Sequence, residues 1–133
     1  SPANRFEAGK RPMSTMTPTM VFNQAGELML VTGSPGGSFI PAAVLRVVSG
    51  VIDFDLNIGE ATMLPRIHKD WPYSGLDHES ILSSDIARQL GIMGHKPESQ
   101  KTMGSTQSIH IKKGINYGYA DLRRPGAAVS TQR

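Results

Sequence analysis

Short apolar runs separated by glycine- and proline-containing turns set the pattern of this chain. Thr19 to Phe22 and Glu27 to Thr32 are two such runs, and the turn Asn23–Gly26 between them completes a predicted β-hairpin. From Phe39 to Phe54, apolar residues cover nearly all faces of a helical projection, and such a helix is usually buried in a core. Ser38 is its expected N-cap, because a serine hydroxyl accepts from the free N–H groups of a first helical turn.

The second half of the chain predicts shorter elements. Asn57–Glu60 has the spacing of a capping box, and the helix that it opens should end near Leu64 because Pro65 follows. A further helix is expected from Asp85 to about Met93, followed by Gly94 in the left-handed conformation. The remaining strand candidates are Arg66–Lys69, Leu76–Glu79, Pro97–Lys101, Gln107–Ile111 and Tyr117–Ala120.

The order of these elements is ββααββαβββ, which is not a regular alternation of strand and helix. Such an order predicts the α+β class with a largely antiparallel sheet. The length of 133 residues allows one domain or a piece of one. We expect residues 1–12 to be an extended lead-in and residues 125–133 to be a frayed tail.

Composition narrows the classes of partner. The formal net charge is only +3 and no dense Lys/Arg run occurs, so a nucleic-acid partner is not expected. No apolar stretch reaches the roughly 20 residues of a membrane span. The chain has no cysteine, and its four histidines are too scattered for a metal motif, so we expect neither a metal nor another cofactor. The four are His68, His78, His95 and His110.

The candidate chemistry lies in the turn Thr32–Ser38, between the second strand and the long helix. A strand, a glycine turn and a helix together present backbone N–H groups to an anion, which can be a phosphate, a carboxylate or the oxyanion of an acyl-transfer intermediate. The turn matches neither a P-loop nor a dinucleotide-binding fingerprint. The neighbouring N–H groups of Gly36 and Gly37 would suit an oxyanion. The structural alternative is a tight turn that only packs the strand on the helix.

Ser14 and Thr15 are a second candidate, because two neighbouring hydroxyls before a strand can donate to a carboxylate. A plain cap or turn is the alternative for this pair.

Longer motifs carry more information than these single features. Arg11–Thr19 and Leu30–Ser38 strongly resemble the γ-glutamyltransferase (γ-glutamyltranspeptidase) family. The resemblance spans nearly the whole chain and continues, in the order of the family, through Val51–Phe54, Asn57–Thr62, Pro65–His68, Met103–Ile109 and Arg123–Pro125.

The resemblance implies part of an N-terminal-nucleophile (Ntn) hydrolase fold, an αββα sandwich. Members of this family are precursors that cut themselves into a large and a small subunit, and the new N-terminal Thr of the small subunit is the nucleophile. This Thr takes the γ-glutamyl group from glutathione or a related γ-glutamyl amide and passes it to water, an amino acid or a peptide. The family is commonly periplasmic or secreted, and the resemblance implies no cofactor.

By this resemblance, the chain is the C-terminal part of a small subunit. The nucleophilic Thr is expected upstream, so Ser1 is not the nucleophile and the chain alone is expected to be inactive. The large subunit of the same precursor is an implied partner.

Two pairs of site residues carry over from the family by position. Gly36 and Gly37 match the glycines whose N–H groups form the oxyanion hole. Ser14 and Thr15 match the two hydroxyl residues that bind the α-carboxylate of the γ-glutamyl group. The family usually has Ser-Ser here, so Thr15 keeps the hydroxyl and adds a methyl group. Gly104–Gln107 is expected to be a turn that orders the last strands.

Two other functions stay open at this point. One is a related Ntn acylase that acts on another acyl group, such as a cephalosporin acylase or a γ-polyglutamate-processing enzyme. The other is a non-catalytic module that uses the glycine turn to hold an anion.

Overall fold

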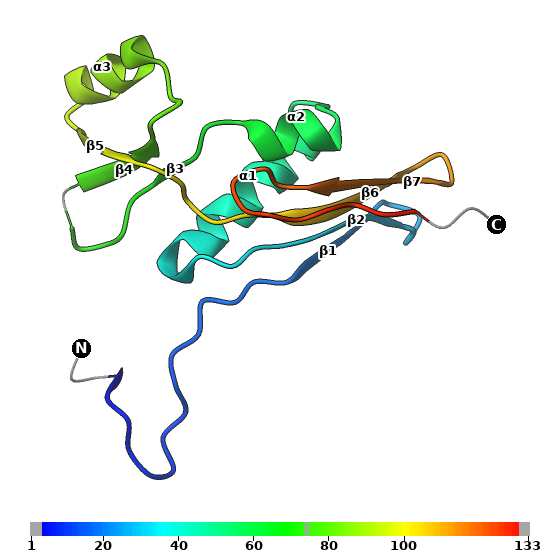
Figure 1. Ribbon diagram of the computed structural model, residues 1–133, viewed down its shortest axis with the longest axis horizontal. Helices are drawn as coiled ribbons and strands as arrows, with labels where there is room; N and C mark the ends of the chain where they lie inside the picture. The colour runs from blue at the N-terminus through cyan, green and yellow to red at the C-terminus, as the bar shows by residue number, and fades with distance from the viewer. Residues whose placement is uncertain (1–3, 74, 131–133) are drawn as a thin grey trace.

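Two β-sheets with helices beside them make up the computed structural model, which describes residues 4–73 and 75–130 (Figure 1). The larger sheet is antiparallel, with the order β1-β2-β6-β7, and the smaller sheet has the order β3-β4-β5. The strands are β1 (Thr19–Phe22), β2 (Leu28–Gly33), β3 (Ile67–His68), β4 (Gly75–Glu79), β5 (Lys96–Gln100), β6 (Gln107–Lys112) and β7 (Ile115–Ala120).

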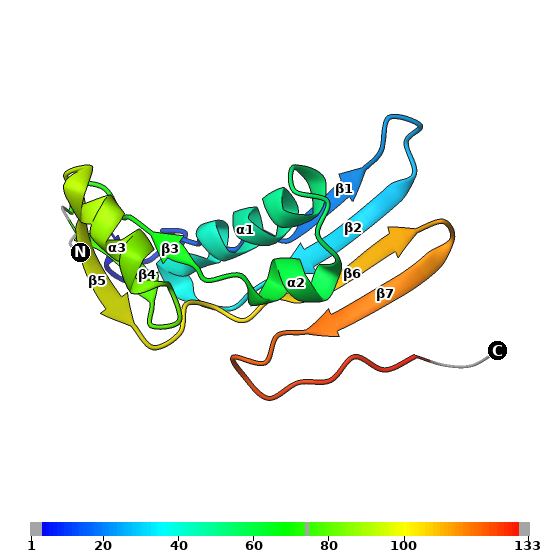
Figure 2. The same cartoon turned by 90° about the horizontal axis from the view of Figure 1, so that it is seen from above.

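Helices α1 and α2 cover one face of the larger sheet, as Figure 2 shows, and α3 lies beside the smaller sheet. A short 3-10 turn, η2, precedes α1. The bounds of these elements are η2 (Gly37–Phe39), α1 (Ile40–Ile52), α2 (Ile58–Met63) and α3 (Ser84–Ile92). The predicted α+β class is therefore confirmed, and the described strands pair antiparallel except for β4 and β5.

The main core lies between α1, α2 and the larger sheet. It consists of Leu30 from β2, Val47 and Val51 from α1, and Ile58 and Ala61 from α2. The two helices approach closely at Gly50, because a Cβ there would lie 2.9 Å from the Cβ of Ala61. Burial of these apolar side chains, at about 25 cal/mol per Å², holds the helices on the sheet.

The long apolar helix is less buried than the sequence predicts. Leu45 and Ile52 are exposed on α1, and Phe54 is exposed just beyond its end. In the described chain, α1 packs mainly on β2, α2 and the short turn η2, and the exposed Leu45 and Ile52 show that one side of it stays open.

The start of this helix also differs from the prediction. Ser38 is not its N-cap, because the backbone first makes the turn η2 and α1 then begins without a side-chain cap. Two other end signals are confirmed. Asn57 and Glu60 form the reciprocal capping box at α2, and Gly94 follows α3 with a φ of +91°.

The predicted hairpin is confirmed by the pairing of Thr19 with Thr32 and of Val21 with Leu30. The last hairpin turns at Lys113 and Gly114, which both have positive φ. Its second strand starts at Ile115, two residues before the predicted start at Tyr117.

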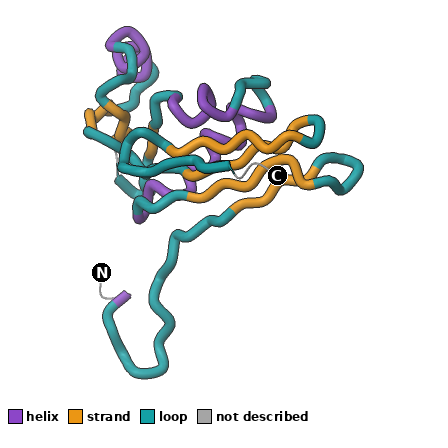
Figure 3. The backbone as a smooth tube through the Cα atoms, turned by 45° about the vertical axis from the view of Figure 1, so that its right-hand side comes forward, coloured by secondary structure: helices purple, strands orange, loops and turns teal. Residues whose placement is uncertain are grey.

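Residues outside these elements lie at both ends of the chain. Residues 5–18 carry no helix or strand and extend away from the sheets (Figure 3). Residues 125–130 also lack regular structure, and a Cβ at Gly118 of β7 would lie 3.4 Å from the Cβ of Ala128. Ser1 and residues 131–133 lie outside the described residues, so the fraying of the tail stays a prediction. No helix in the described part is long and apolar enough to cross a membrane.

Candidate functional site

The glycine turn connects β2 to η2, and its backbone requires glycine. Gly36 has a φ of +145° and Gly37 a φ of +59°, values that side-chain-bearing residues rarely adopt. A Cβ at Gly36 would also lie 3.0 Å from the Cα of Gly104. The turn therefore combines an unusual backbone conformation with a close approach by a second loop.

Two neighbouring N–H groups are free in this turn. Within the described part of the chain, neither the N–H of Gly36 nor that of Gly37 donates a hydrogen bond. Their carbonyls are occupied, because Gly36 O accepts from the N–H of Phe39 at 3.2 Å and Gly37 O accepts from the hydroxyl of Thr15 at 2.7 Å. Adjacent free donors on a fixed backbone are the arrangement that stabilises an oxyanion.

The structure brings the second candidate pair to the same place. Thr15 lies 22 residues before Gly37 and contacts it through its side chain. The hydroxyl of Ser14 accepts from the N–H of Met16 at 3.2 Å, and its own hydrogen stays free. Ser14 can thus donate to a carboxylate without giving up a contact, whereas Thr15 must first release the carbonyl of Gly37.

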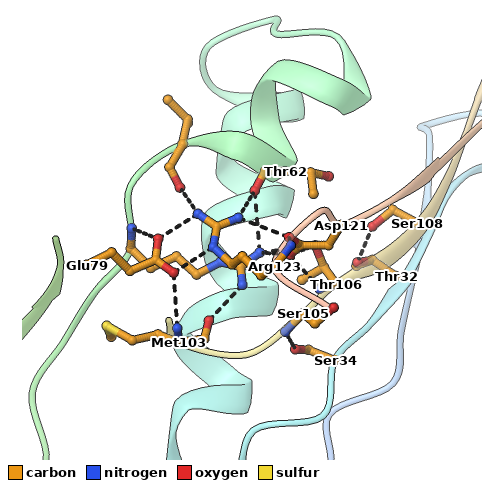
Figure 4. Close-up of polar contacts among 12 residues, drawn as sticks. Thr32, Ser34, Thr62, Glu79, Met103, Ser105, Thr106, Ser108, Asp121 and Arg123 are labelled. Atoms are coloured by element: carbon orange, nitrogen blue, oxygen red, sulfur yellow. Dashed lines mark hydrogen bonds and ion pairs between the residues drawn. The ribbon is translucent and has the colours of Figure 1, made fainter. Parts of the chain in front are cut away.

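A loop from the far end of the chain holds the glycine turn. The N–H of Ser105 donates to Ser34 Oγ at 2.9 Å (Figure 4). Ser34 Oγ in turn donates to Pro35 O at 2.7 Å. Gly104 in this loop has a φ of +75°, and a Cβ there would lie only 2.7 Å from Ser34 Oγ. The sequence predicts Gly104–Gln107 only as a turn that orders the last strands. In the structure, Gly104 and Ser105 also contact the glycine turn at Ser34.

Four charged residues anchor that loop, three of them buried and the fourth, Arg123, with a side chain that is 6% exposed. Arg66 pairs with Asp121 at 2.6 Å, and Arg123 pairs with Glu79 at 2.5 Å and with Asp121 at 3.2 Å. Both ends of the loop are hydrogen-bonded to this cluster. Met103 O accepts from Arg66 Nη1 at 2.7 Å, and the N–H of Thr106 donates to Asp121 at 2.8 Å. Figure 4 shows how these groups converge between α2 and the ends of β4 and β7.

Burial and pairing shift the pKa values in this cluster. Burial and the neighbouring Arg123 lower the pKa of Arg66. Burial alone would lower the pKa of Arg123, but the carboxylates of Glu79 and Asp121 raise it above its ordinary value. Burial would raise the pKa of Asp121, and N–H donors from Arg123 and Thr106 together with the Arg66 guanidinium bring it below its usual range. The pairing therefore keeps Asp121 and Arg123 charged at neutral pH.

Sequence reasoning did not find this cluster. Arg66 and Asp121, which pair directly, are 55 residues apart along the chain, so no local spacing predicts their contact. The one available signal was the presence of Arg66 and Arg123 inside segments that resemble the family. Among the described residues, no group of three or more His, Asp or Glu side chains could hold a metal ion.

Together, the fold and the site define the class: an α+β protein whose strand-to-helix turn presents two N–H groups to an anion. Comparison with known proteins identifies the family. The sequence model described as gamma-glutamyltranspeptidase matches residues 1–131. The chain therefore belongs to the gamma-glutamyltranspeptidase family.

Individual relatives agree with this assignment. The chain is 44% identical over 122 residues to the glutathione hydrolase proenzyme of Escherichia coli K12, an alignment that covers 91% of the chain and 21% of the relative. The chain thus spans about a fifth of the length of the proenzyme relatives that it matches.

Solved structures confirm the fold. A gamma-glutamyltranspeptidase from Helicobacter pylori superposes with a TM-score of 0.85 at 40% identity, covering 93% of this chain and 69% of that one. A mutant of the enzyme from Pseudomonas nitroreducens gives a TM-score of 0.88 at 31% identity, covering 100% and 70%. The fold expected from the resemblance, part of an Ntn hydrolase sandwich with a largely antiparallel sheet, is confirmed.

Proposed function

We propose that the protein to which this chain belongs is a γ-glutamyltransferase that takes its acyl group from glutathione or a related γ-glutamyl amide. The acceptor is water, an amino acid or a peptide. The observation that carries the proposal is the pair of free N–H groups at Gly36 and Gly37, in a chain that belongs to this family. A turn that only packs strand on helix would also leave first-turn N–H groups to water, so the proposal depends on these donors together with the family to which the chain belongs.

In this reaction, the hydroxyl of an upstream N-terminal Thr adds to the amide carbon of the γ-glutamyl group. The amine of that Thr takes the hydroxyl proton and later delivers it to the leaving amine. The former carbonyl oxygen becomes an oxyanion, which accepts from the N–H groups of Gly36 and Gly37. Loss of one such donor costs roughly 3 kcal/mol of transition-state stabilisation.

Substrate selection rests on the segment before β1. Ser14 has a free hydroxyl hydrogen and lies next to Thr15, which is bonded to the glycine turn. A carboxylate held by Ser14 would therefore lie near the turn that receives the oxyanion. This arrangement favours a substrate with a free α-carboxylate, which a γ-glutamyl group has.

The activity requires protein outside this chain. The nucleophile is expected upstream, and the partner is the large subunit of the same precursor, in line with the name proenzyme that the relatives carry. We expect residues 1–133 alone to be inactive.

The experiment uses the full-length protein with two matched chromogenic amides, γ-glutamyl-p-nitroanilide and glutaryl-p-nitroanilide, which lacks the α-amino group. The proposal predicts faster release of p-nitroaniline from the γ-glutamyl amide, and transfer to added glycylglycine. Faster cleavage of the glutaryl amide would instead identify a related acylase of the cephalosporin type. Tight binding of glutamate without cleavage of either amide would identify an anion-binding module.

A further inference from the structure

A serine beside the glycine turn has a hydrogen-bonding arrangement that the proposed function leaves unused. We propose that Ser34 is a positioning residue that sets the direction of the first oxyanion donor, and that the loop 103–106 holds Ser34 in place. This inference rests on the proposed function, because only in that function does the N–H of Gly36 donate to an oxyanion.

The first step is the geometry of one peptide group. Pro35 C=O and Gly36 N–H belong to the same peptide plane and point in opposite directions. Ser34 Oγ donates to Pro35 O at 2.7 Å. A hydrogen bond on the carbonyl side of the plane therefore fixes the direction of the N–H on its other side.

The second step is the direction of the Ser34 hydroxyl itself. A serine hydroxyl has one hydrogen to donate and two lone pairs that accept. The N–H of Ser105 occupies a lone pair of Ser34 Oγ at 2.9 Å, which leaves the hydrogen for Pro35 O. The two bonds form a relay from Ser105 through Ser34 to the peptide that carries the N–H of Gly36.

The second oxyanion donor does not depend on a side chain. The plane that contains the N–H of Gly37 also contains Gly36 O, which accepts from the backbone N–H of Phe39. The turn η2 therefore orients that plane by itself. Of these two planes, only the first is held by a side-chain hydrogen bond in the described structure, so a substitution at Ser34 acts on the N–H of Gly36 and leaves that of Gly37 in place.

The loop that holds Ser34 has little room to move. Gly104 has positive φ, and a Cβ there would lie 2.7 Å from Ser34 Oγ and 3.2 Å from Pro35 O. On either side of Gly104 and Ser105, Met103 and Thr106 are buried and bonded to Arg66 and Asp121. The buried ion pairs thereby connect to the oxyanion turn through a single short loop.

The test uses the full-length protein and three variants: Ser34→Ala, Ser34→Thr, which keeps the hydroxyl, and Ser99→Ala, a control on exposed β5. For each, kcat and KM for γ-glutamyl-p-nitroanilide are measured per processed small subunit, together with Kd for glutamate. We expect Ser34→Ala to lower kcat about 10- to 100-fold, since a misdirected donor loses part of what a deleted one loses. KM and the Kd for glutamate should stay within about twofold, since ground-state binding does not use the oxyanion donors.

Gly104→Ala tests the same relay from the other side. Its methyl group must displace Ser34 Oγ, so kcat should fall in the same direction as in Ser34→Ala. The double variant should be no slower than the more damaged single variant, because both changes break one relay.

Three kinetic or binding results would overturn the inference. They are an unchanged kcat in Ser34→Ala, an equal loss in Ser34→Thr, and a loss of kcat matched by an equal loss of glutamate binding. Crystal structures of wild type and Ser34→Ala give a readout independent of activity, and an unchanged Pro35–Gly36 peptide direction in the variant also overturns it. If wild type cleaves no γ-glutamyl amide, the proposed function fails, and these structures still decide the positioning role.

Discussion

Ser14 and Thr15 are neighbours in sequence, but they use their hydroxyls differently. Thr15 donates to Gly37 O at 2.7 Å, whereas the hydrogen of Ser14 has no acceptor in the described chain. The free hydroxyl of Ser14 is suited to hold a carboxylate, and that of Thr15 joins the segment before β1 to the glycine turn.

Ser14→Ala in the full-length protein should therefore weaken ground-state binding. A hydrogen bond to a charged group contributes about 1.5–3 kcal/mol, so we expect the Kd for glutamate to rise at least about 10-fold. Isothermal titration gives this Kd, and Ser99→Ala, at an exposed position of β5 outside the candidate site, is the comparison. An unchanged Kd in Ser14→Ala would remove this residue from the carboxylate site.

At the scale of elements, the buried ion pairs join parts of the chain that no hydrogen-bonded sheet connects. Arg123, which follows β7, reaches Glu79 at the end of β4 and the carbonyls of Thr62 and Leu64 at the end of α2. Breaking a buried pair on one side leaves an uncompensated charge, which typically costs about 3–5 kcal/mol.

Arg123→Met should therefore lower the thermal midpoint of the full-length protein by several degrees. The neighbouring residue offers a matched control, because Arg124 is exposed and its side chain has no partner in the described structure. Arg124→Met should leave the midpoint within about one degree. Equal midpoints in the two variants, measured by differential scanning calorimetry, would show that the cluster does not stabilise the fold.

Strand β6 contributes a pH dependence through His110. Burial, together with the nearby Lys112, lowers the pKa of this imidazole, while Asp55 acts in the opposite direction. Because the pKa is lower in the folded state, the unfolded state takes up the proton first as the pH falls. Stability should therefore decrease as the pH drops below about 6.5, the ordinary value for histidine.

His110→Gln should reduce the difference in thermal midpoint between pH 7 and pH 5. In the control variant His95→Gln, this difference should equal that of wild type. The measurement is a series of thermal scans at constant ionic strength. A slope that survives in His110→Gln would assign the pH dependence to other groups.

Local signals explain which elements could be predicted from sequence. The capping box of Asn57 and Glu60 and the hairpin turn before β2 involve residues only three or four positions apart, so spacing alone specifies them. The cap at Ser38 was predicted wrongly, because the glycines before it allow a 3-10 turn that propensity does not include. The contact of Ser34 with Ser105 joins residues 71 positions apart, and it depends on tertiary packing that no local pattern encodes.

In the candidate site, too, the sequence predicts the residues and the structure shows how they contact one another. Gly36, Gly37, Ser14 and Thr15 are predicted as site residues because their types and order match a family motif. The bond between Thr15 and Gly37, which brings the two pairs together, was visible only in the structure.

At the scale of the whole molecule, one face of the larger sheet lacks a helical layer. Leu30 faces α1, so the alternation along the strands places Met20, Val31 and Ile109 on the opposite face. Met20 is 65% exposed and Ile109 45% exposed. Exposed apolar surface of this kind marks an interface, and we expect the remainder of the full-length protein to cover it.

Ile109→Asp in the full-length protein should then place an unpaired carboxylate in that interface, which costs several kcal/mol. We expect a thermal midpoint lower by several degrees than that of Lys113→Asp, a control in the exposed turn after β6. Equal midpoints would mean that this face stays in contact with water in the complete protein.

The most direct test of the central claim is mass spectrometry of the full-length protein, quenched during turnover of glutathione. The account predicts two subunits, the smaller beginning at a Thr upstream of Ser1 and carrying a single γ-glutamyl group on that Thr. A single uncut chain without any γ-glutamyl adduct would contradict it, and the glycine turn would then belong to a protein that binds an anion without acyl transfer.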